Sequence, residues 1–328
     1  MFNYIPERFA SETADNEEEA ARWLDGDDSA RRPPELLTRD VVARSILAEV
    51  KAGRGSPHGG VFLDISSRRD ADYIRRRLPS MYHQFKELAD IDITTAPMEV
   101  GPTCHYMMGG VRVDSDTQQA TIPGLFAAGE VAGGMHGANR LGGNSLSDLV
   151  VFGMLAGRHA AEYSTASGSP APVPEEVLDD HAEEALAPFD EHGDENPYSI
   201  QNDLQECMSS LVGIIRTESE MLEALDRLEV LKERLARVHV EGHRQYNPGW
   251  HLALDLRSLL TVSECIARAA LERQESRGAQ TRDDFPTTDG QWGKRRVVIR
   301  QQDGEVVVSQ EPLSEMPEEL RQLVEEEG

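Results

Sequence analysis

Most of the chain carries the apolar spacing of amphipathic helices. From Leu204 to Leu235, apolar residues form a long stripe at helical spacing, with one polar gap between Ile215 and Met221. The same spacing predicts helices over residues 39–51, 70–88, 146–163, 175–192, 202–240 and 249–275. The last three ranges follow one another closely, so they predict a helical bundle in the second half of the chain.

Short apolar runs bounded by turn residues predict the strands. Runs with the length and composition of strands occupy residues 61–65, 97–113 and 125–131. The last of these runs suits a buried strand. Residues 297–308 predict a β-hairpin, because Asp303 and Gly304 form a dipeptide that suits a two-residue turn.

A glycine-rich loop lies between the strand predicted at residues 125–131 and the helix that follows. Asn144 and Ser145 occupy the positions where an N-cap is expected. Glycines allow a backbone to approach a ligand closely, and a helix N-terminus attracts an electron-rich group. Arg140 in this loop could hold a carboxylate through two parallel hydrogen bonds. The alternative is an ordinary glycine-rich turn that carries a surface arginine.

The balance of acidic and basic residues argues against some kinds of binding partner. The chain has 59 acidic and 33 basic residues, a net charge of −26, and nearly all of its positive charge is arginine. Such a surface argues against binding to nucleic acid or to an anionic membrane, which both need basic patches. It fits either an ordinary acidic protein or one from a high-salt cytoplasm, where counterions screen the repulsion between carboxylates.

The cysteines do not form a metal-binding or disulfide pattern. Cys104, Cys207 and Cys265 are widely separated and odd in number, so the sequence predicts neither a zinc nor an iron–sulfur site. Reduced thiols of this kind fit a cytosolic protein. The sequence also has no apolar run long enough to span a bilayer.

Several separated stretches resemble the flavoprotein subunits of succinate dehydrogenase and fumarate reductase. The stretches are Arg39-Asp-Val-Val-Ala-Arg44, Pro102-Thr-Cys-His-Tyr-Met-Met-Gly-Gly110, His136-Gly-Ala-Asn-Arg-Leu-Gly-Gly-Asn-Ser-Leu146, Asn247-Pro-Gly-Trp-His251 and Ser276-Arg-Gly-Ala-Gln-Thr-Arg-Asp-Asp-Phe-Pro286. They occur in the family's order, and the resemblance covers nearly all of the chain. The resemblance implies a mixed fold, α+β or α/β.

The resemblance also implies a division into domains. Residues 1–96 would be part of a capping domain, and residues 97–166 the C-terminal part of a flavin-binding domain. Residues 167–290 would begin with a linker rich in Ser, Gly and Pro and form the helical bundle. Residues 291–328 would form the hairpin and an acidic tail.

By the same resemblance, three residues would act on succinate or fumarate. His105 and Arg140 would bind the carboxylates, and Arg39 would be the catalytic acid and base that moves the proton. Each has a plainer alternative. His105 could be a hydrogen-bonded core histidine, and Arg39 could be a surface arginine, although a cation at a helix start is unfavourable for the helix dipole.

The implied cofactor is FAD. Glu130, Ser145 and Leu146 would contact it, with the helix N-terminus near the isoalloxazine ring. The family's phosphate-binding glycines, its flavin-attached histidine and part of its dicarboxylate clamp would lie before Met1. We therefore expect Met1 to be an internal start, and the chain to be a C-terminal portion that is inactive by itself.

The family implies partners and a location as well. The partners would be membrane-anchor subunits together with an iron–sulfur subunit, which would hold the chain on the cytoplasmic face of a membrane. Two alternatives stay open. One is a related enzyme, L-aspartate oxidase, which has similar segments. The other is a non-catalytic remnant or assembly module that binds a partner without flavin.

Overall fold

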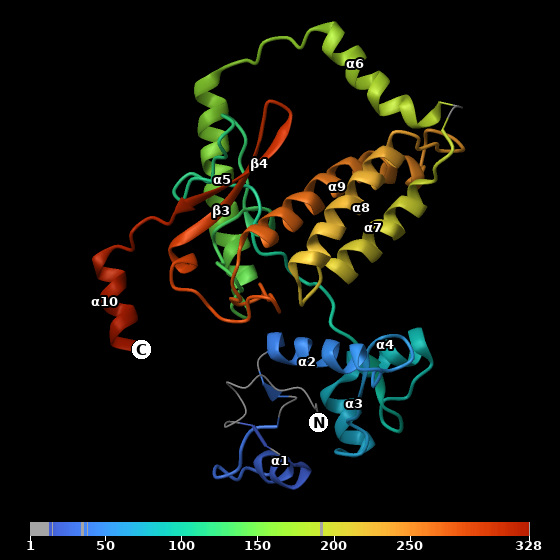
Figure 1. Cartoon of the computed structure of the whole chain (residues 1–328), viewed down its shortest axis with the longest axis vertical. Coiled ribbons are helices and arrows are strands. Elements are labelled where there is room, and N and C mark those ends of the chain that lie inside the picture. Colours follow the sequence, from blue (N-terminus) through green and yellow to red (C-terminus); the bar gives the residue numbers. More distant parts are fainter. Residues whose placement is uncertain (1–12, 15, 34–35, 38, 191–192, 328) are drawn as a thin grey trace. The chain divides into compact units, whose positions relative to one another are not determined.

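The computed structural model describes residues 13–14, 16–33, 36–37, 39–190 and 193–327. The chain divides into two compact units, residues 1–107 and 108–328. Both units combine helices with a pair of antiparallel strands (Figure 1). This mixed content confirms the expectation of an α+β fold. The domain boundaries expected after residues 96, 166 and 290 stay predictions.

The described part of the first unit contains short helices and one pair of strands. Its elements are α1 (Glu17–Leu24), α2 (Arg39–Lys51), β1 (Val61–Leu63), α3 (Ala71–Arg77), α4 (Pro79–Ala89) and β2 (Met98–Val100). Strands β1 and β2 are antiparallel, with Val61 opposite Val100. Ile74, Ile93 and Met98 are buried together and form the small core of this unit.

The single helix predicted over residues 70–88 is wrong, because the structure has two helices there. Asp70 caps α3 by accepting a hydrogen bond from the N–H of Tyr73. The break falls at Leu78, with φ −127° and ψ 49°, directly before Pro79. A residue before proline avoids the helical region, while proline itself is well suited to the first turn of a helix. The helix predicted at residues 39–51 is confirmed as α2.

The second unit begins with an irregular segment that leads into α5 (Asn144–Ser167). The buried strand predicted at residues 125–131 is wrong. Leu125 and Val131 are 46% and 57% exposed, and the segment ends in a 3₁₀ turn, η3 (Gly129–Val131). Gly129 takes a φ of +76°, which interrupts an extended strand. Phe126 nevertheless packs edge to face against Tyr163 on α5.

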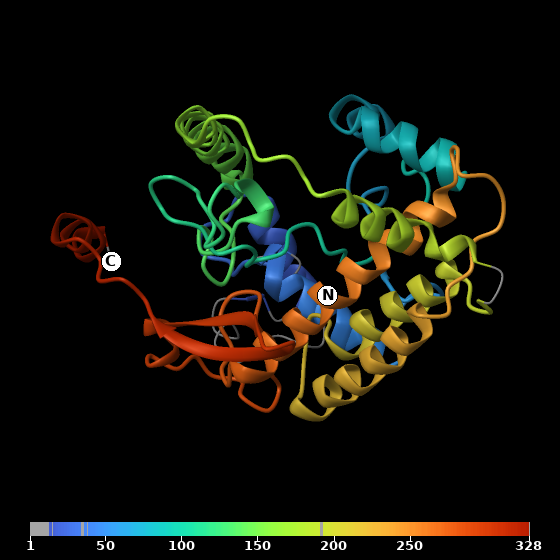
Figure 2. The same ribbon diagram turned by 90° about the horizontal axis from the view of Figure 1, so that it is seen from above.

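Three helices form the bundle predicted for the second half of the chain (Figure 2). They are α7 (Pro197–Leu211), α8 (Glu218–Leu235) and α9 (Pro248–Glu272). Leu204, Leu228 and Leu256 are buried at their shared core. The continuous helix predicted over residues 202–240 is wrong, since α7 ends at Leu211 and Thr217 starts α8 with a capping box. Before the bundle lie α6 (Glu175–Leu186) and the 3₁₀ turn η4 (Ala187–Phe189).

The hairpin predicted at residues 297–308 is confirmed and is longer than expected. The last elements of the chain are η5 (Trp292–Lys294), β3 (Arg295–Gln302), β4 (Glu305–Pro312) and α10 (Glu318–Glu327). Asp303 and Gly304 form the turn with φ values of 52° and 86°, as a two-residue hairpin loop of mirror-image type requires. Gln310 on β4 donates a hydrogen bond of 2.6 Å to Glu272, which ties the hairpin to the end of α9.

Candidate functional site

The glycine-rich loop ends at the N-terminus of α5. The predicted caps Asn144 and Ser145 are wrong, because the N-cap is Gly143, whose φ of +86° favours glycine. Helix α5 therefore starts without a side-chain cap, while main-chain bonds from Asn144 to Leu141 and from Leu146 to Gly143 occupy two N–H groups of its first turn. Such an end favours an electron-rich ligand.

A buried hydrogen bond fixes the first half of the loop to α5. Nε2 of His136 lies 3.1 Å from Oδ2 of Asp148, and the two side chains are 9% and 2% exposed. Asp148 is one turn into α5, so the pair holds the loop against the helix. His136 thus shapes the loop.

A second motif joins the loop through its main chain. The N–H of Val111 donates to the carbonyl of Val131 at 2.7 Å, and the N–H of Gly133 donates to Val111 at 2.8 Å. Gly110 makes this approach possible, because a Cβ there would lie 2.2 Å from the oxygen of Val131. The end of the 102–110 motif therefore lies beside η3, where Glu130 is found.

Four of the predicted site residues belong to this second unit. Arg140 is half-buried, and its Nη1 donates to the carbonyl of Leu141 at 3.3 Å. Glu130 is exposed on η3, and Ser145 is half-buried in the first turn of α5. Leu146 is 71% exposed. These side chains thus lie on the loop and on the two elements that flank it.

The other two predicted site residues belong to the first unit. Arg39 is the first residue of α2 and is exposed, whereas Arg44 on the same helix is buried and pairs with Asp40 at 2.9 Å. His105 is also exposed, and its ring meets that of Tyr106 edge to face. The expectation that all six residues share one site stays a prediction.

A third segment, which no pattern in the sequence had linked to the site, also contacts the loop. The N–H of Ala279 donates to the carbonyl of Ala138 at 2.9 Å. Gly278 has a φ of +58°, and a Cβ there would lie 2.7 Å from the oxygen of Ala138. The signal in the sequence was the resemblance of Ser276 to Pro286 to a stretch of the family, whereas the charges of this segment look like ordinary surface charges.

Those charged residues form a buried network. Glu275 is fully buried and accepts hydrogen bonds from Arg273, from Arg277 and from the N–H of Asp289. Burial opposes ionisation of Glu275, but the hydrogen bonds from Arg277 and Asp289 outweigh it and hold its pKa below the ordinary value. The segment is therefore anchored by charge-assisted hydrogen bonds rather than by apolar packing.

Arg282 is the centre of the same segment and is also fully buried. Its Nε and Nη2 donate to the two carboxylate oxygens of Asp284 at 2.7 Å each. Its Nη1 donates to the carbonyls of Ala270 and Leu271 at 3.1 and 3.0 Å, which closes the end of α9. The hydrogen bonds from Arg282 lower the pKa of Asp284 from 3.8 to about 2.

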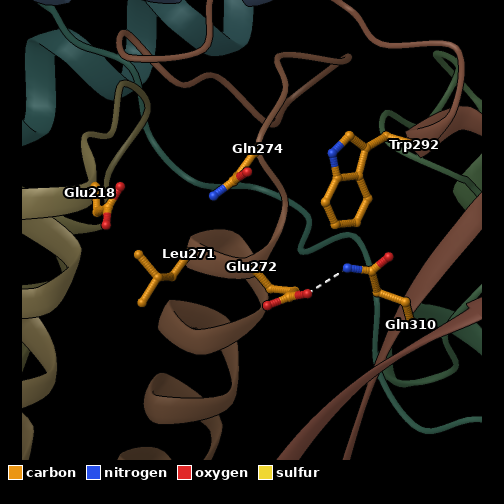
Figure 3. A pocket seen from close by; sticks show the side chains of 6 residues that line it. All are labelled: Glu218, Leu271, Glu272, Gln274, Trp292 and Gln310. Atoms are coloured by element: carbon orange, nitrogen blue, oxygen red, sulfur yellow. Dashed lines mark hydrogen bonds between the residues drawn. The ribbon is translucent and has the colours of Figure 1, made fainter.

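A separate cavity of about 250 Å³ lies beside the end of α9 (Figure 3). Its lining residues are Glu218, Leu271, Glu272, Gln274, Trp292 and Gln310. The lining has two carboxylates and none of the predicted site residues. Such a lining repels a dianion, so this cavity does not serve as the carboxylate site expected from the sequence.

Two features are absent from the described residues. These residues contain no group of three or more His, Cys, Asp or Glu side chains arranged to hold a metal ion. Over the same residues, none of the helices combines the length and the apolar character needed to cross a membrane.

Two family models match the chain. Residues 7–146 match the model described as FAD binding domain, and residues 201–323 match the model described as fumarate reductase flavoprotein C-term. The first range contains the loop, η3 and the start of α5. The second contains most of the bundle, the charged segment and the hairpin.

Named relatives agree with these models. The chain is 41% identical over 265 residues to a chain of the fumarate reductase (CoM/CoB) of Methanothermobacter marburgensis, a match that covers 81% of this chain and 47% of that protein. It is 39% identical over 281 residues to the succinate dehydrogenase flavoprotein subunit of Coxiella burnetii, covering 81% and 48%. A chain of the solved structure of Mycobacterium smegmatis Sdh1 in complex with UQ1 is 57% identical, with a TM-score of 0.83 and coverage of 90% and 50%.

Fold and motifs together define a flavoprotein. The chain belongs to the family of succinate dehydrogenase and fumarate reductase flavoprotein subunits. It spans about half the length of the curated relatives it matches.

Proposed function

We propose that this chain supplies the loop and helix N-terminus that hold FAD and a dicarboxylate in a flavoprotein that interconverts succinate and fumarate. One observation carries the proposal: two of the motifs are in contact through their main chains. Gly110 and Val111 pack against the main chain of residues 131–133, next to the loop that bears Arg140. The matched family models and relatives support the same activity.

The residues of the loop fit a flat, electron-rich cofactor. A Cβ built on Gly134, Gly137, Gly142 or Gly143 would meet nothing within 4 Å, so the loop leaves open space along its backbone. The uncapped start of α5 supplies N–H groups and a partial positive charge, and Leu146 adds an exposed apolar side chain. Glu130, Ser145 and Leu146 would therefore be the cofactor contacts, and bound FAD would supply the hydride acceptor or donor.

The two carboxylates of the substrate need cationic or hydrogen-bonding partners. Arg140 would bind one carboxylate from the loop, and His105 would bind the other. Arg39 would deliver or remove the proton on the carbon next to the one that exchanges the hydride. Local positive charge matters here, since the chain as a whole has a net charge of −26 and repels a dianion.

The flavoprotein would work within a larger complex. We propose that membrane-anchor subunits, together with an iron–sulfur subunit, attach it to the cytoplasmic face of a membrane. The Coxiella burnetii relative, whose name describes it as a subunit, supports this. Co-purification from membranes with a tagged chain tests it, and recovery of the tagged chain only from the cytosol, without other subunits, would contradict it.

A chimera tests the proposed activity. In it, this chain replaces the matching half of the Mycobacterium smegmatis Sdh1 chain, to which it is 57% identical. We expect the chimera to retain a flavin absorbance band and to oxidise succinate. A folded chimera that binds flavin and neither binds dicarboxylates nor turns over succinate would overturn the proposal and favour a non-catalytic role.

A further inference from the structure

The charged segment after α9 contacts the glycine-rich loop at one defined place. The N–H of Ala279 donates to the carbonyl of Ala138 at 2.9 Å. Gly278 lies so close that a Cβ there would be 2.7 Å from the Ala138 oxygen and 2.9 Å from the Cβ of Asn139. The contact thus falls on the two residues that directly precede Arg140.

The turn that makes this contact is itself held rigidly. Arg277 and Gln280 exchange main-chain hydrogen bonds of 2.8 and 3.0 Å, which closes the turn around Gly278. The side chain of Gln280 accepts a bond of 2.6 Å from Arg216 and donates one of 3.2 Å to Ala270 at the end of α9. Hydrogen bonds therefore fix the turn to the helical bundle on one side, and the turn contacts the loop on the other.

The loop is held at two points. His136 is bonded to Asp148 on α5, and Ala138 is bonded to Ala279. Arg140 follows the second point by two residues, so a displacement of the Ala138 peptide moves the backbone that carries its guanidinium. A shift of about 1 Å in a group that orients a substrate can lower the rate up to about a hundredfold.

We propose that the turn at residues 277–280 is a positioning element for the substrate-binding arginine, with Gly278 and Gln280 as its positioning residues. This inference rests on the proposed function for the role of Arg140, but not for the coupling between the turn and the loop. Gly278 permits the close approach, and Gln280 fixes the distance between the turn and the loop. The helical bundle thereby sets the geometry of a site to which it contributes no reacting group.

The first arm of the test uses the 328-residue chain and measures amide hydrogen exchange in residues 136–143. Gly278→Ala should raise exchange in this loop by about tenfold, because the added Cβ displaces the Ala138 carbonyl. The matched control is Gly304→Ala, since Gly304 also has a positive φ, of 86°, but nothing lies within 4 Å of its Cβ position. Equal loop exchange in the two variants would overturn the coupling, whatever the chain catalyses.

The second arm uses the chimera with Mycobacterium smegmatis Sdh1. Gly278→Ala and Gln280→Leu should raise the KM for succinate by about tenfold, lower kcat by a smaller factor, and leave the flavin content unchanged. Gln280→Glu, which keeps an acceptor for Arg216, should recover most of the loss. An inactive parent chimera would contradict the proposed function while leaving the exchange result valid. An active parent with normal kinetics in both variants would refute the positioning role.

Discussion

The arginine at the centre of the charged segment offers a direct test of how this fold is held together. Arg282→Met removes a fully buried guanidinium and keeps most of the volume of its aliphatic stem. The change removes two hydrogen bonds of 2.7 Å from Asp284, which keeps the bond from the N–H of Glu218, and it removes the Arg282 donor from the carbonyls of Ala270 and Leu271. The side chain of Asp284 is 28% exposed, so water compensates part of the lost ion pair, and we expect a cost of roughly 2–4 kcal/mol of unfolding free energy, less than for a fully buried pair.

The expected loss is large enough to measure by heat or urea. For a unit of the size of residues 108–328, each kcal/mol lowers Tm by roughly 2–4 °C, so a loss of roughly 2–4 kcal/mol should lower the melting temperature by about 4–16 °C. The control is Arg227→Met on α8, because Arg227 pairs with Glu223 at 2.6 Å on the surface, with both side chains about half exposed. An exposed pair of this kind contributes about 0.3–0.5 kcal/mol.

A double-mutant cycle isolates the ion pair from the rest of the network. The pKa of Asp284 is lowered from 3.8 to about 2, chiefly by its hydrogen bonds with Arg282, and this shift of nearly two units corresponds to about 2 kcal/mol. We therefore expect Arg282→Met and Asp284→Asn to show a coupling energy of about 2 kcal/mol at pH 7. A total loss below about 1 kcal/mol, or no coupling, would refute the reasoning.

The same pair predicts a pH signature. Because the pKa of Asp284 is lower in the folded chain, its contribution to stability is fully present above about pH 4 and is lost as the pH falls toward 2. The stability difference between the wild-type chain and Arg282→Met should therefore shrink over that window. Urea titrations at about pH 5, 3.5 and 2.5 measure it, and a constant difference would contradict the assignment.

Three further predictions concern the chimera and the acidic surface. Arg39→Gln should leave dicarboxylate affinity within several-fold while succinate turnover collapses, since a proton-transfer role acts in the transition state; near-normal turnover would make Arg39 a structural residue. Arg140→Ala and His105→Ala should each weaken dicarboxylate binding about ten- to hundredfold, the value of a charge-assisted hydrogen bond, and unchanged binding in calorimetry would remove that residue from the site. Tm should rise with potassium chloride as the Debye length falls from about 10 Å at 0.1 M to about 3 Å at 1 M, and a flat or falling curve would exclude the high-salt interpretation.

The sequence predicted which segments are helical better than it predicted where they break. Apolar period alone joined α7 to α8, because apolar residues recur at helical spacing on both sides of the polar run from Arg216 to Glu220. The interruption comes from local chemistry, namely the capping box at Thr217. Pro79 likewise interrupts a helix. The apolar spacing continues across it, but Leu78, the residue before the proline, leaves the helical region. Short-range signals therefore decided the ends of elements, and periodicity decided their type.

The candidate site shows a different limit. Arg140 could be singled out because its neighbours in sequence are glycines that lead into a helix. Gly278 could not, because its importance comes from a contact with Ala138, 140 positions earlier in the chain. Arg282 and Glu275 look like ordinary surface charges in the sequence, yet both are fully buried. Both are buried because the fold gives each of them several hydrogen-bond partners, and the sequence pattern does not show which residues those partners are.

The outcome at residues 125–131 follows from the same principle. An apolar run predicts burial only if the fold brings another apolar surface to it. Here the main chain makes its hydrogen bonds elsewhere, since Val131 accepts from Val111 and the Ala127 N–H donates to Gln118. Gly129 then turns the segment toward α5 with a φ of +76°. The run places Glu130 and the loop beside the start of a helix. A ligand at this end of the unit would therefore contact a loop and a helix N-terminus, not a sheet.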